Sequence, residues 1–126
     1  MRDLLTLNDG SKPVGAYSLG VWTGKTLYMS GILGITDELV KSHDIKKETS
    51  NAMNQAILLL ESQGLTLENV VKATIYLSNM EKFLEFDETY KDFFKNSYPA
   101  RATVEVSKLA INANIEIVLT AYDENR

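Results

Sequence analysis

The sequence predicts an α+β fold in which two helices pack on one face of a mixed β-sheet. Two observations lead to this fold class: two segments repeat apolar residues at helical spacing, and several short runs rich in β-branched residues surround them. The 126 residues show no repeats, low-complexity tracts or linkers, so we expect one compact domain over residues 1–126.

The second face of this sheet has no predicted cover, because a chain of this length cannot supply a third layer. That face is expected either to be polar or to pack against other copies of the chain. The apolar content of the strands favours self-association. The βαβ portions should cross over in the right-handed sense.

The N-terminal part of the chain predicts a β-hairpin. Two apolar runs, residues 16–22 and 26–30, lie on either side of a short turn that contains Gly24. Residues 31–34 then end the pattern and predict a loop that runs to His43.

The first helix is predicted over residues 45–62. Asp44 is a suitable N-cap, and Gly64 is a suitable residue to follow the last turn. The apolar residues of this segment recur at helical spacing and form one stripe: Ala52, Met53, Ala56, Ile57 and Leu60.

The second helix is predicted to open at a capping box formed by residues 78–81 and to end before Pro99. Strands are predicted over residues 70–77 before it, and near residues 103–106 and 115–122 after it. The aromatic residues of this helix face one side and are expected in the core: Phe83, Phe86, Tyr90, Phe93 and Phe94.

Composition narrows the chemistry that this chain can perform. The net charge of −4 disfavours tight non-specific binding of nucleic acid, and the absence of cysteine excludes disulfides, thiol nucleophiles and thiolate metal sites. With one histidine and no P-loop, dinucleotide fingerprint or nucleophile elbow, we expect no metal and no cofactor. No signal peptide and no apolar run long enough for a bilayer are visible, so a cytoplasmic protein without a membrane partner is expected.

Arg101 and Glu116 are the leading candidates for chemistry. Arg101 follows a proline at the mouth of a predicted strand, where its planar guanidinium can grip a carboxylate with two parallel hydrogen bonds. Glu116 lies on the last strand among apolar residues and could act as a general base. The alternatives are a surface arginine paired with a nearby acid and a glutamate that simply faces solvent. The functional interpretation predicts a small acidic substrate and a proton-transfer step.

Four other residues are weaker candidates. Tyr17 and Ser30 offer hydroxyls that could orient a substrate or a water, and Gly31 permits close approach of backbone. Each could equally reflect turn chemistry at the end of a strand. Asp87 shares a helix face with the aromatic residues and is either part of a pocket or the rim of an amphipathic stripe.

Several motifs, in order along nearly the whole chain, give the sequence a resemblance to the RidA/YjgF family. The most specific is the run from Pro99 to Val106, which reads Pro-Ala-Arg-Ala-Thr-Val-Glu-Val. The other motifs are Gly15-Ala16-Tyr17-Ser18, Tyr28-Met29-Ser30-Gly31, Asn69-Val70-Val71-Lys72-Ala73-Thr74, Tyr90-Lys91-Asp92-Phe93-Phe94 and Ile115-Glu116-Ile117.

The resemblance implies a chorismate-mutase-like fold and a homotrimer with sites at subunit interfaces. It implies hydrolysis of 2-imino and enamine acids, such as 2-iminobutanoate and 2-iminopropanoate, to 2-keto acids and ammonia without a cofactor. The arginine that grips the substrate carboxylate corresponds to Arg101, and the backbone amide that assists it belongs to Thr103. The glutamate that positions the attacking water corresponds to Glu116, and the tyrosine and serine of the first two motifs correspond to Tyr17 and Ser30.

The sequence also departs from the family pattern. Ala16 stands where the family usually has proline, and Asp87 stands where active members commonly carry asparagine. The segment of residues 32–37 is shorter and more apolar than the loop that many members have at this place. These changes bear on substrate range and rate. Two alternatives to imine hydrolysis remain: a non-catalytic trimer that binds a small carboxylate and regulates a partner, and a ribonuclease, which the acidic balance disfavours.

Overall fold

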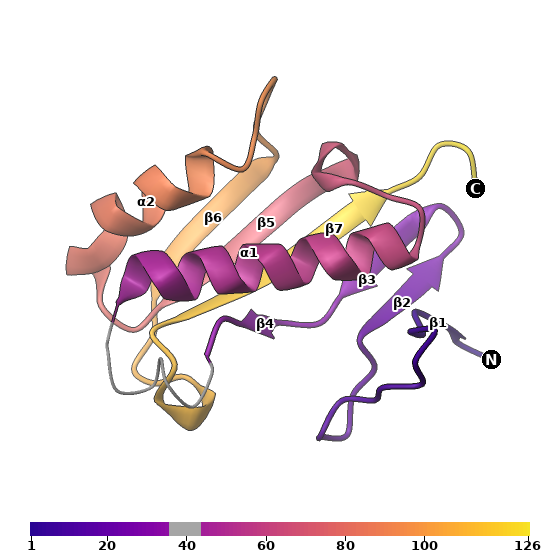
Figure 1. Ribbon diagram of the computed structural model, residues 1–126, viewed down its shortest axis with the longest axis horizontal. Coiled ribbons are helices and arrows are strands. Elements are labelled where there is room, and N and C mark those ends of the chain that lie inside the picture. The colour runs from indigo at the N-terminus through magenta and orange to yellow at the C-terminus, as the bar shows by residue number, and fades with distance from the viewer. Residues whose placement is uncertain (36–43) are drawn as a thin grey trace.

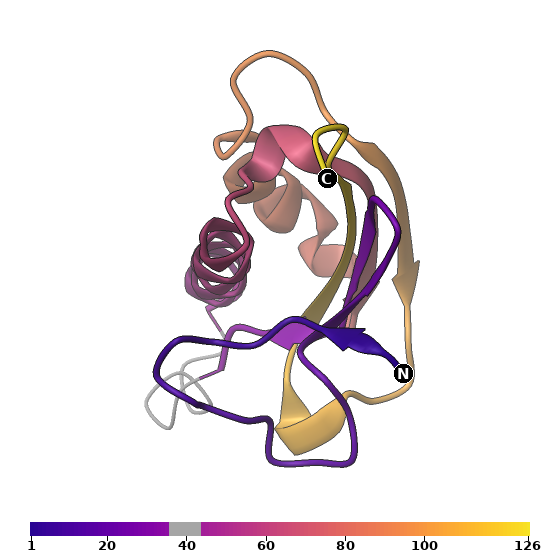
Figure 2. The same cartoon turned by 90° about the vertical axis from the view of Figure 1, so that its right-hand side faces the viewer.

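A computed structural model describes residues 1–35 and 44–126 of the chain. Helices α1 and α2 lie on one face of a seven-stranded sheet, as the edge-on view makes clear (Figures 1 and 2). The elements in chain order are β1 (Asp3–Leu4), β2 (Gly20–Thr23), β3 (Thr26–Met29), β4 (Ile32–Leu33), α1 (Ile45–Ser62), β5 (Val70–Leu77), α2 (Phe83–Lys91), β6 (Ala100–Glu105) and β7 (Ile115–Tyr122).

The sheet has the order β1-β2-β3-β7-β5-β6, with β4 paired to β7 off this path. Among the described strands, only β5 and β6 run parallel, and the crossover that joins them contains α2. The other described pairs are antiparallel. The predicted mixed sheet with both helices on one face is therefore confirmed. β7 is central because it pairs with β3, β4 and β5.

The predicted hairpin is present, although β2 begins at Gly20 and residues 16–19 are not part of the strand. Gly24 has φ +58°, a left-handed conformation that glycine adopts without steric cost. The break predicted after Gly31 contains a strand, β4, which the sequence did not indicate. Two residues carry too weak a local pattern, and this strand depends on its pairing with β7. The rest of the predicted loop, residues 36–43 with His43, lies outside the described residues.

Helix α1 has the predicted bounds. The Asp44 carboxylate accepts from the backbone amides of Lys46 and Lys47, which otherwise lack partners in the first turn. The chain leaves the helix through Gly64, whose φ is +75°. Ile57 of the predicted apolar stripe is half-buried. The other four residues of the stripe are fully buried: Ala52, Met53, Ala56 and Leu60.

Helix α2 differs from the prediction at its start. A 3₁₀ turn over Met80–Lys82 precedes it, and the cap of that turn is Asn79, whose side chain accepts from the Glu81 amide. Ser78, the expected cap, instead donates its hydroxyl to the Asn114 side chain and its backbone amide to the Asn114 carbonyl. Pairing with the segment before β7 therefore engages Ser78, and the cap lies one residue later, at Asn79.

The strands that follow position the candidate residues. β5 and β7 have the predicted bounds, whereas β6 starts at Ala100, earlier than expected. Arg101 therefore lies inside the edge strand rather than at its mouth. β6 forms one edge of the sheet, and Val104 on this strand is 43% exposed.

The face of the sheet opposite the helices has no cover among the described elements (Figure 2). Strand alternation and register place polar and apolar side chains there together: Val21, Tyr28, Thr74, Tyr76, Val118 and Thr120. Within the described residues, no helix has both the length and the apolar character needed to cross a bilayer.

The end of the chain packs on its beginning. Arg126 forms an ion pair with Asp3, and its guanidinium lies 3.7 Å from the centroid of the Trp22 ring. Trp22 is buried and donates its indole N–H to Gln63 at the end of α1. These contacts hold β1 and β2 against the rest of the sheet.

Candidate active site

The predicted site residues other than Thr103 fall into two separate pockets. We call the first the glutamate pocket: a cavity of about 470 Å³ lined by Tyr17, Ser30, Gly31, Leu33, Ala110 and Glu116. We call the second the arginine pocket: a cavity of about 400 Å³ lined by Asp87, Tyr90, Lys91, Tyr98, Pro99 and Arg101. Both are large enough for an acid of a few carbon atoms.

The glutamate pocket depends on a glycine beneath the carboxylate. A Cβ at Gly31 would lie 2.6 Å from Cδ and 2.7 Å from Oε1 of Glu116, closer than real side chains approach. The register of β4 on β7 aligns Leu33 with Glu116, which brings this segment against the carboxylate. Gly31 therefore allows the Glu116 side chain to lie directly over the backbone.

Ser30 is fixed on the wall of the same pocket. Its backbone amide donates to the Leu19 carbonyl at 3.0 Å, and its hydroxyl donates to the Ser18 carbonyl at 2.5 Å. Because its proton is committed to Ser18, the Ser30 oxygen can only accept a further hydrogen bond. Tyr17, which is 54% exposed, lines the same pocket and carries the other hydroxyl that the sequence singled out.

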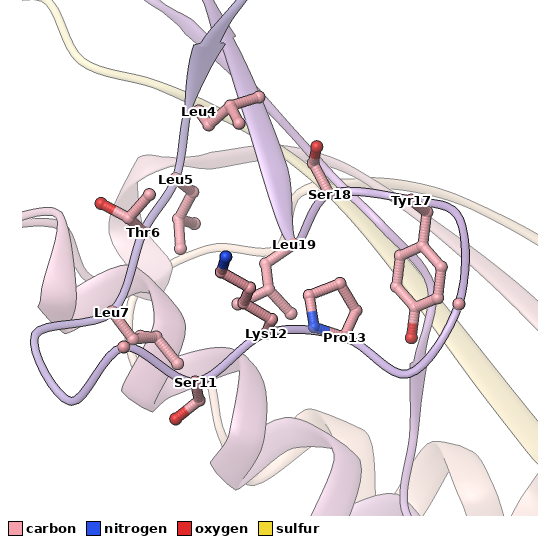
Figure 3. A pocket seen from close by; sticks show the side chains of 12 residues that line it. Leu4, Leu5, Thr6, Leu7, Ser11, Lys12, Pro13, Tyr17, Ser18 and Leu19 are labelled. Atoms are coloured by element: carbon pink, nitrogen blue, oxygen red, sulfur yellow. The ribbon is translucent and has the colours of Figure 1, made fainter.

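A third cavity lies next to Tyr17, between the first residues and the loop before β2 (Figure 3). It measures about 370 Å³, and Lys12 is the charged residue among its mostly apolar lining. It contains neither Arg101 nor Glu116, so it does not assemble the predicted chemistry.

In the arginine pocket the guanidinium of Arg101 is held from two directions. Nη1 donates to Asp87 Oδ1 at 2.7 Å, and the side chain of Arg101 is only 23% exposed. Its Cζ lies 5.5, 5.4 and 5.0 Å from the ring centroids of Phe83, Phe86 and Tyr90. Cation–π attraction to these rings and the ion pair fix the orientation of the charge.

Tyr90 connects this pocket to the core. It is 2% exposed, and its hydroxyl has no hydrogen-bond partner within the part of the chain that the structure describes. Burial raises the pKa of Tyr90 to about 12, an effect that Arg101 opposes and Asp87 reinforces. The phenol therefore stays neutral and is available as a hydrogen-bond donor. The helical aromatic pattern of the sequence indicated the burial of Tyr90 but not its place beside the pocket.

Thr103 lies two residues beyond Arg101 and shares its face of β6. The Val106 amide donates to the Leu77 carbonyl of β5, so the Thr103 amide, three residues earlier, points to the side of β6 that lacks a neighbouring strand. Its Oγ1 is buried and has no hydrogen-bond partner among the described residues. The amide that the family resemblance assigns to carboxylate binding is thus at the sheet edge.

The two pockets do not meet within one chain. Glu116 aligns with Tyr76 of β5, which aligns with Val104 of β6. Arg101 is an odd number of residues from Val104, so its side chain projects from the opposite face of the sheet. The two Cα positions are also separated by about 10 Å across the strands and about 10 Å along them. A small substrate cannot contact Arg101 and Glu116 of the same chain.

No group of three potential metal-ligating side chains occurs among residues 1–35 and 44–126. Lys91 and Tyr98 line the arginine pocket without having been singled out in the sequence. An exposed lysine and an aromatic residue in a connecting segment carry no local signal of a shared cavity.

Comparison with known proteins gives consistent results. The family model described as endoribonuclease L-PSP matches residues 9–123. A RutC family protein of Pyrococcus horikoshii is 37% identical over 127 residues, which covers 98% of this chain and 100% of that protein. A 2-iminobutanoate/2-iminopropanoate deaminase of Dermatophagoides farinae is 36% identical over 109 residues and covers 84% of each chain. The crystal structure of RidA from an Antarctic Psychrobacter is 28% identical, has a TM-score of 0.84 and covers 96% of this chain and 100% of its own.

Proposed function

The chain belongs to the RidA/YjgF/RutC (endoribonuclease L-PSP) family, and from this premise we propose that it hydrolyses 2-imino and enamine acids to 2-keto acids and ammonia. The observation that carries the proposal is the arginine pocket, in which a half-buried guanidinium that contacts aromatic rings lines a cavity of about 400 Å³. The name of the mite relative supports 2-iminobutanoate and 2-iminopropanoate as substrates. No cofactor is required by this proposal.

The complete site is proposed to form between two copies of the chain in a homotrimer. One copy contributes the arginine pocket, and its neighbour contributes the glutamate pocket with Tyr17 and Ser30. Support comes from β6, which pairs with β5 on one side and forms the edge of the described sheet on the other. This strand carries Arg101 and exposes Val104. Support also comes from the separation of Arg101 and Glu116, because a single chain cannot present both groups to one substrate.

Binding in this site begins with the substrate carboxylate. Free N–H groups of Arg101 and the edge-facing amide of Thr103 hold the two carboxylate oxygens and so fix the position of C2. Tyr17 and Ser30 of the neighbouring copy orient the water that approaches C2. Most of the rate acceleration is proposed to come from this positioning, because the imine is already reactive.

The chemical step is a hydrolysis. Glu116 removes a proton from the water as its oxygen bonds to C2, and the C=N electron pair moves to nitrogen. The resulting carbinolamine receives the proton from Glu116 on its nitrogen. Glu116 then passes the hydroxyl proton of the carbinolamine to its nitrogen while the C–N bond breaks and the C=O bond forms, which releases ammonia and the 2-keto acid.

The test couples the protein to a dehydratase that produces 2-iminobutanoate from threonine, in the presence of semicarbazide. Semicarbazide traps the imine, so an active deaminase lowers the rate of semicarbazone formation and raises that of 2-oxobutanoate. We expect this effect from the wild type and from Glu124→Gln, which removes an exposed carboxylate that lines neither pocket. Arg101→Ala and Glu116→Gln should abolish it, and wild-type turnover by Arg101→Ala would overturn the proposal.

A second candidate is a non-catalytic trimer that binds a small carboxylate and regulates a partner. The observation that favours it is the ion pair of Arg101 with Asp87, since one N–H of the clamp is already in use. Calorimetry would distinguish the two candidates. Tight binding of a 2-keto acid without imine turnover would support the regulatory trimer.

A further inference from the structure

We propose that Asp87 makes the arginine pocket selective for acids that carry a positively charged nitrogen on the carbon next to the carboxylate. This inference rests on the proposed function and names its substrate form: the zwitterionic 2-iminium acid, with 2-amino acids as competing ligands. The 2-keto acid product, an anion that carries no positive group, is the form that the pocket disfavours. Asp87 is thus a specificity-determining residue.

The ion pair leaves most of the arginine available. Asp87 Oδ1 accepts one N–H of Nη1 at 2.7 Å, and a guanidinium has five N–H donors. The remaining donors can still hold a carboxylate. The Asp87 side chain is 40% exposed, so it is accessible to a ligand in the pocket.

Charge balance then decides which acids bind. Arg101 and Asp87 together contribute no net charge, so a bound carboxylate meets an acidic neighbour as well as its basic partner. Among the residues that the structure describes, Asp87 is the one carboxylate that lines this cavity. Lys91 also lines it, but Lys91 is exposed and its charge is largely screened by solvent. An anion without a compensating positive group is therefore repelled by Asp87.

The protonated nitrogen of a 2-imino acid supplies the compensating positive charge, and the geometry of the molecule places it near Asp87. Its nitrogen and its nearest carboxylate oxygen are about 3 Å apart, which is also the length of a hydrogen bond. When Arg101 holds the substrate carboxylate, the substrate nitrogen therefore lies within reach of the Asp87 carboxylate, which contacts the same guanidinium. The protonated nitrogen donates to Asp87, whereas a keto oxygen at the same place offers only lone pairs to it.

The surroundings strengthen this discrimination. The guanidinium lies against the rings of Phe83, Phe86 and Tyr90, which shield it in part from water and so lower the local dielectric response. The interaction energy between two charges is larger in such a partly shielded place than at an open surface. The same preference favours turnover, because protonation of the C=N nitrogen makes C2 more electrophilic and because the product loses the group that Asp87 holds.

The experiment compares the dissociation constants of 2-aminobutanoate and 2-oxobutanoate by calorimetry. Neither compound is turned over, and they differ at the group that faces Asp87. We expect the wild type to bind the amino acid at least about tenfold more tightly. Asp87→Asn keeps the side-chain shape and the bond to Arg101, and it should remove this preference or reverse it. Asp92→Asn, a matched change at an exposed carboxylate outside the pocket, should leave it unchanged.

Three results would overturn the inference: an equal or tighter affinity of the wild type for 2-oxobutanoate, an unchanged preference in Asp87→Asn, or no binding of either ligand. The inference and the proposed function fail separately. A wild type that discriminates as expected but does not accelerate imine loss keeps the inference and loses the deaminase activity. A wild type that accelerates imine loss without discriminating keeps the activity and loses the role of Asp87.

Discussion

Arg101 projects from the helix-bearing face of the sheet, whereas Glu116 projects from the opposite face, two strands away. The register of β5 with both neighbours fixes this relationship, because Tyr76 aligns with Glu116 on one side and with Val104 on the other. The arrangement separates the group that can hold an anion from the group that can move a proton. Contact of both with one small molecule requires a second chain.

Mixing two inactive variants is expected to restore activity. If Arg101→Ala and Glu116→Gln chains exchange subunits in equal amounts, an interface with an intact arginine on one side and an intact glutamate on the other forms at about a quarter of the sites. Imine hydrolysis should therefore return to about a quarter of the wild-type rate after unfolding and joint refolding. A mixture that stays inactive, although mass spectrometry shows mixed oligomers, contradicts a shared site.

Gly31→Ala is expected to lower activity with little effect on stability. The new Cβ would lie 2.6 Å from the carboxyl carbon of Glu116, so the carboxylate must move. A displacement of this kind can reduce turnover about 100-fold, while the flexible Glu116 side chain absorbs the strain. Steady-state kinetics measure the loss of turnover and chemical denaturation measures the stability. A wild-type turnover rate for Gly31→Ala would show that the Glu116 carboxylate does not need this position.

Tyr90→Phe is expected to change how stability depends on alkaline pH. Burial raises the pKa of Tyr90 from 10.0 to about 12. Between these values the unfolded chain releases a proton that the native protein retains, so the free energy of unfolding falls as the pH rises. Urea unfolding at about pH 9 and about pH 11 measures this fall in the free energy of unfolding, which should be smaller for Tyr90→Phe than for the wild type. Equal losses in the two proteins would show that Tyr90 ionises normally in the native state.

Leu60→Ala is expected to destabilise the fold strongly. Leu60 is fully buried on the face of α1 that contacts the sheet, and its truncation should lower the free energy of unfolding by about 2–5 kcal/mol. Leu58 lies on the same helix but is 59% exposed, so Leu58→Ala should change that free energy by no more than about 0.5 kcal/mol. Chemical denaturation of both variants measures the difference, and similar values would place the core elsewhere.

Much of the fold was predictable because its signals are local. Asp44 and Gly64 mark the ends of α1, and β-branched runs mark β5 and β7, so the bounds of these elements agree with the prediction. β4 was not predicted, because two residues become a strand only through pairing with β7.

The candidate residues were also visible in the sequence, but their grouping was not. Alternation along one strand tells which neighbours share a face, yet it does not relate Arg101 on β6 to Glu116 on β7. That relation depends on the register of β5 with each of them. The sequence offered pairing with a nearby acid as the alternative for Arg101 and placed Asp87 either in a pocket or at the rim of a stripe, but it did not join these two interpretations. The structure does so, because Asp87 is the acid that contacts Arg101 at 2.7 Å.

The position of β7 has a consequence for how the chain acquires its structure during synthesis. β7 lies between β3 and β5 in the sheet, although it is the last of these strands to be synthesised. The β2–β3 hairpin and the β5–β6 pair therefore share no partner strand among the described elements until residues 115–122 have been synthesised. Until then both intermediates expose apolar strand edges, which is the condition under which nascent chains associate wrongly. The many contacts distant in sequence that β7 completes also predict slow, late closure of the sheet.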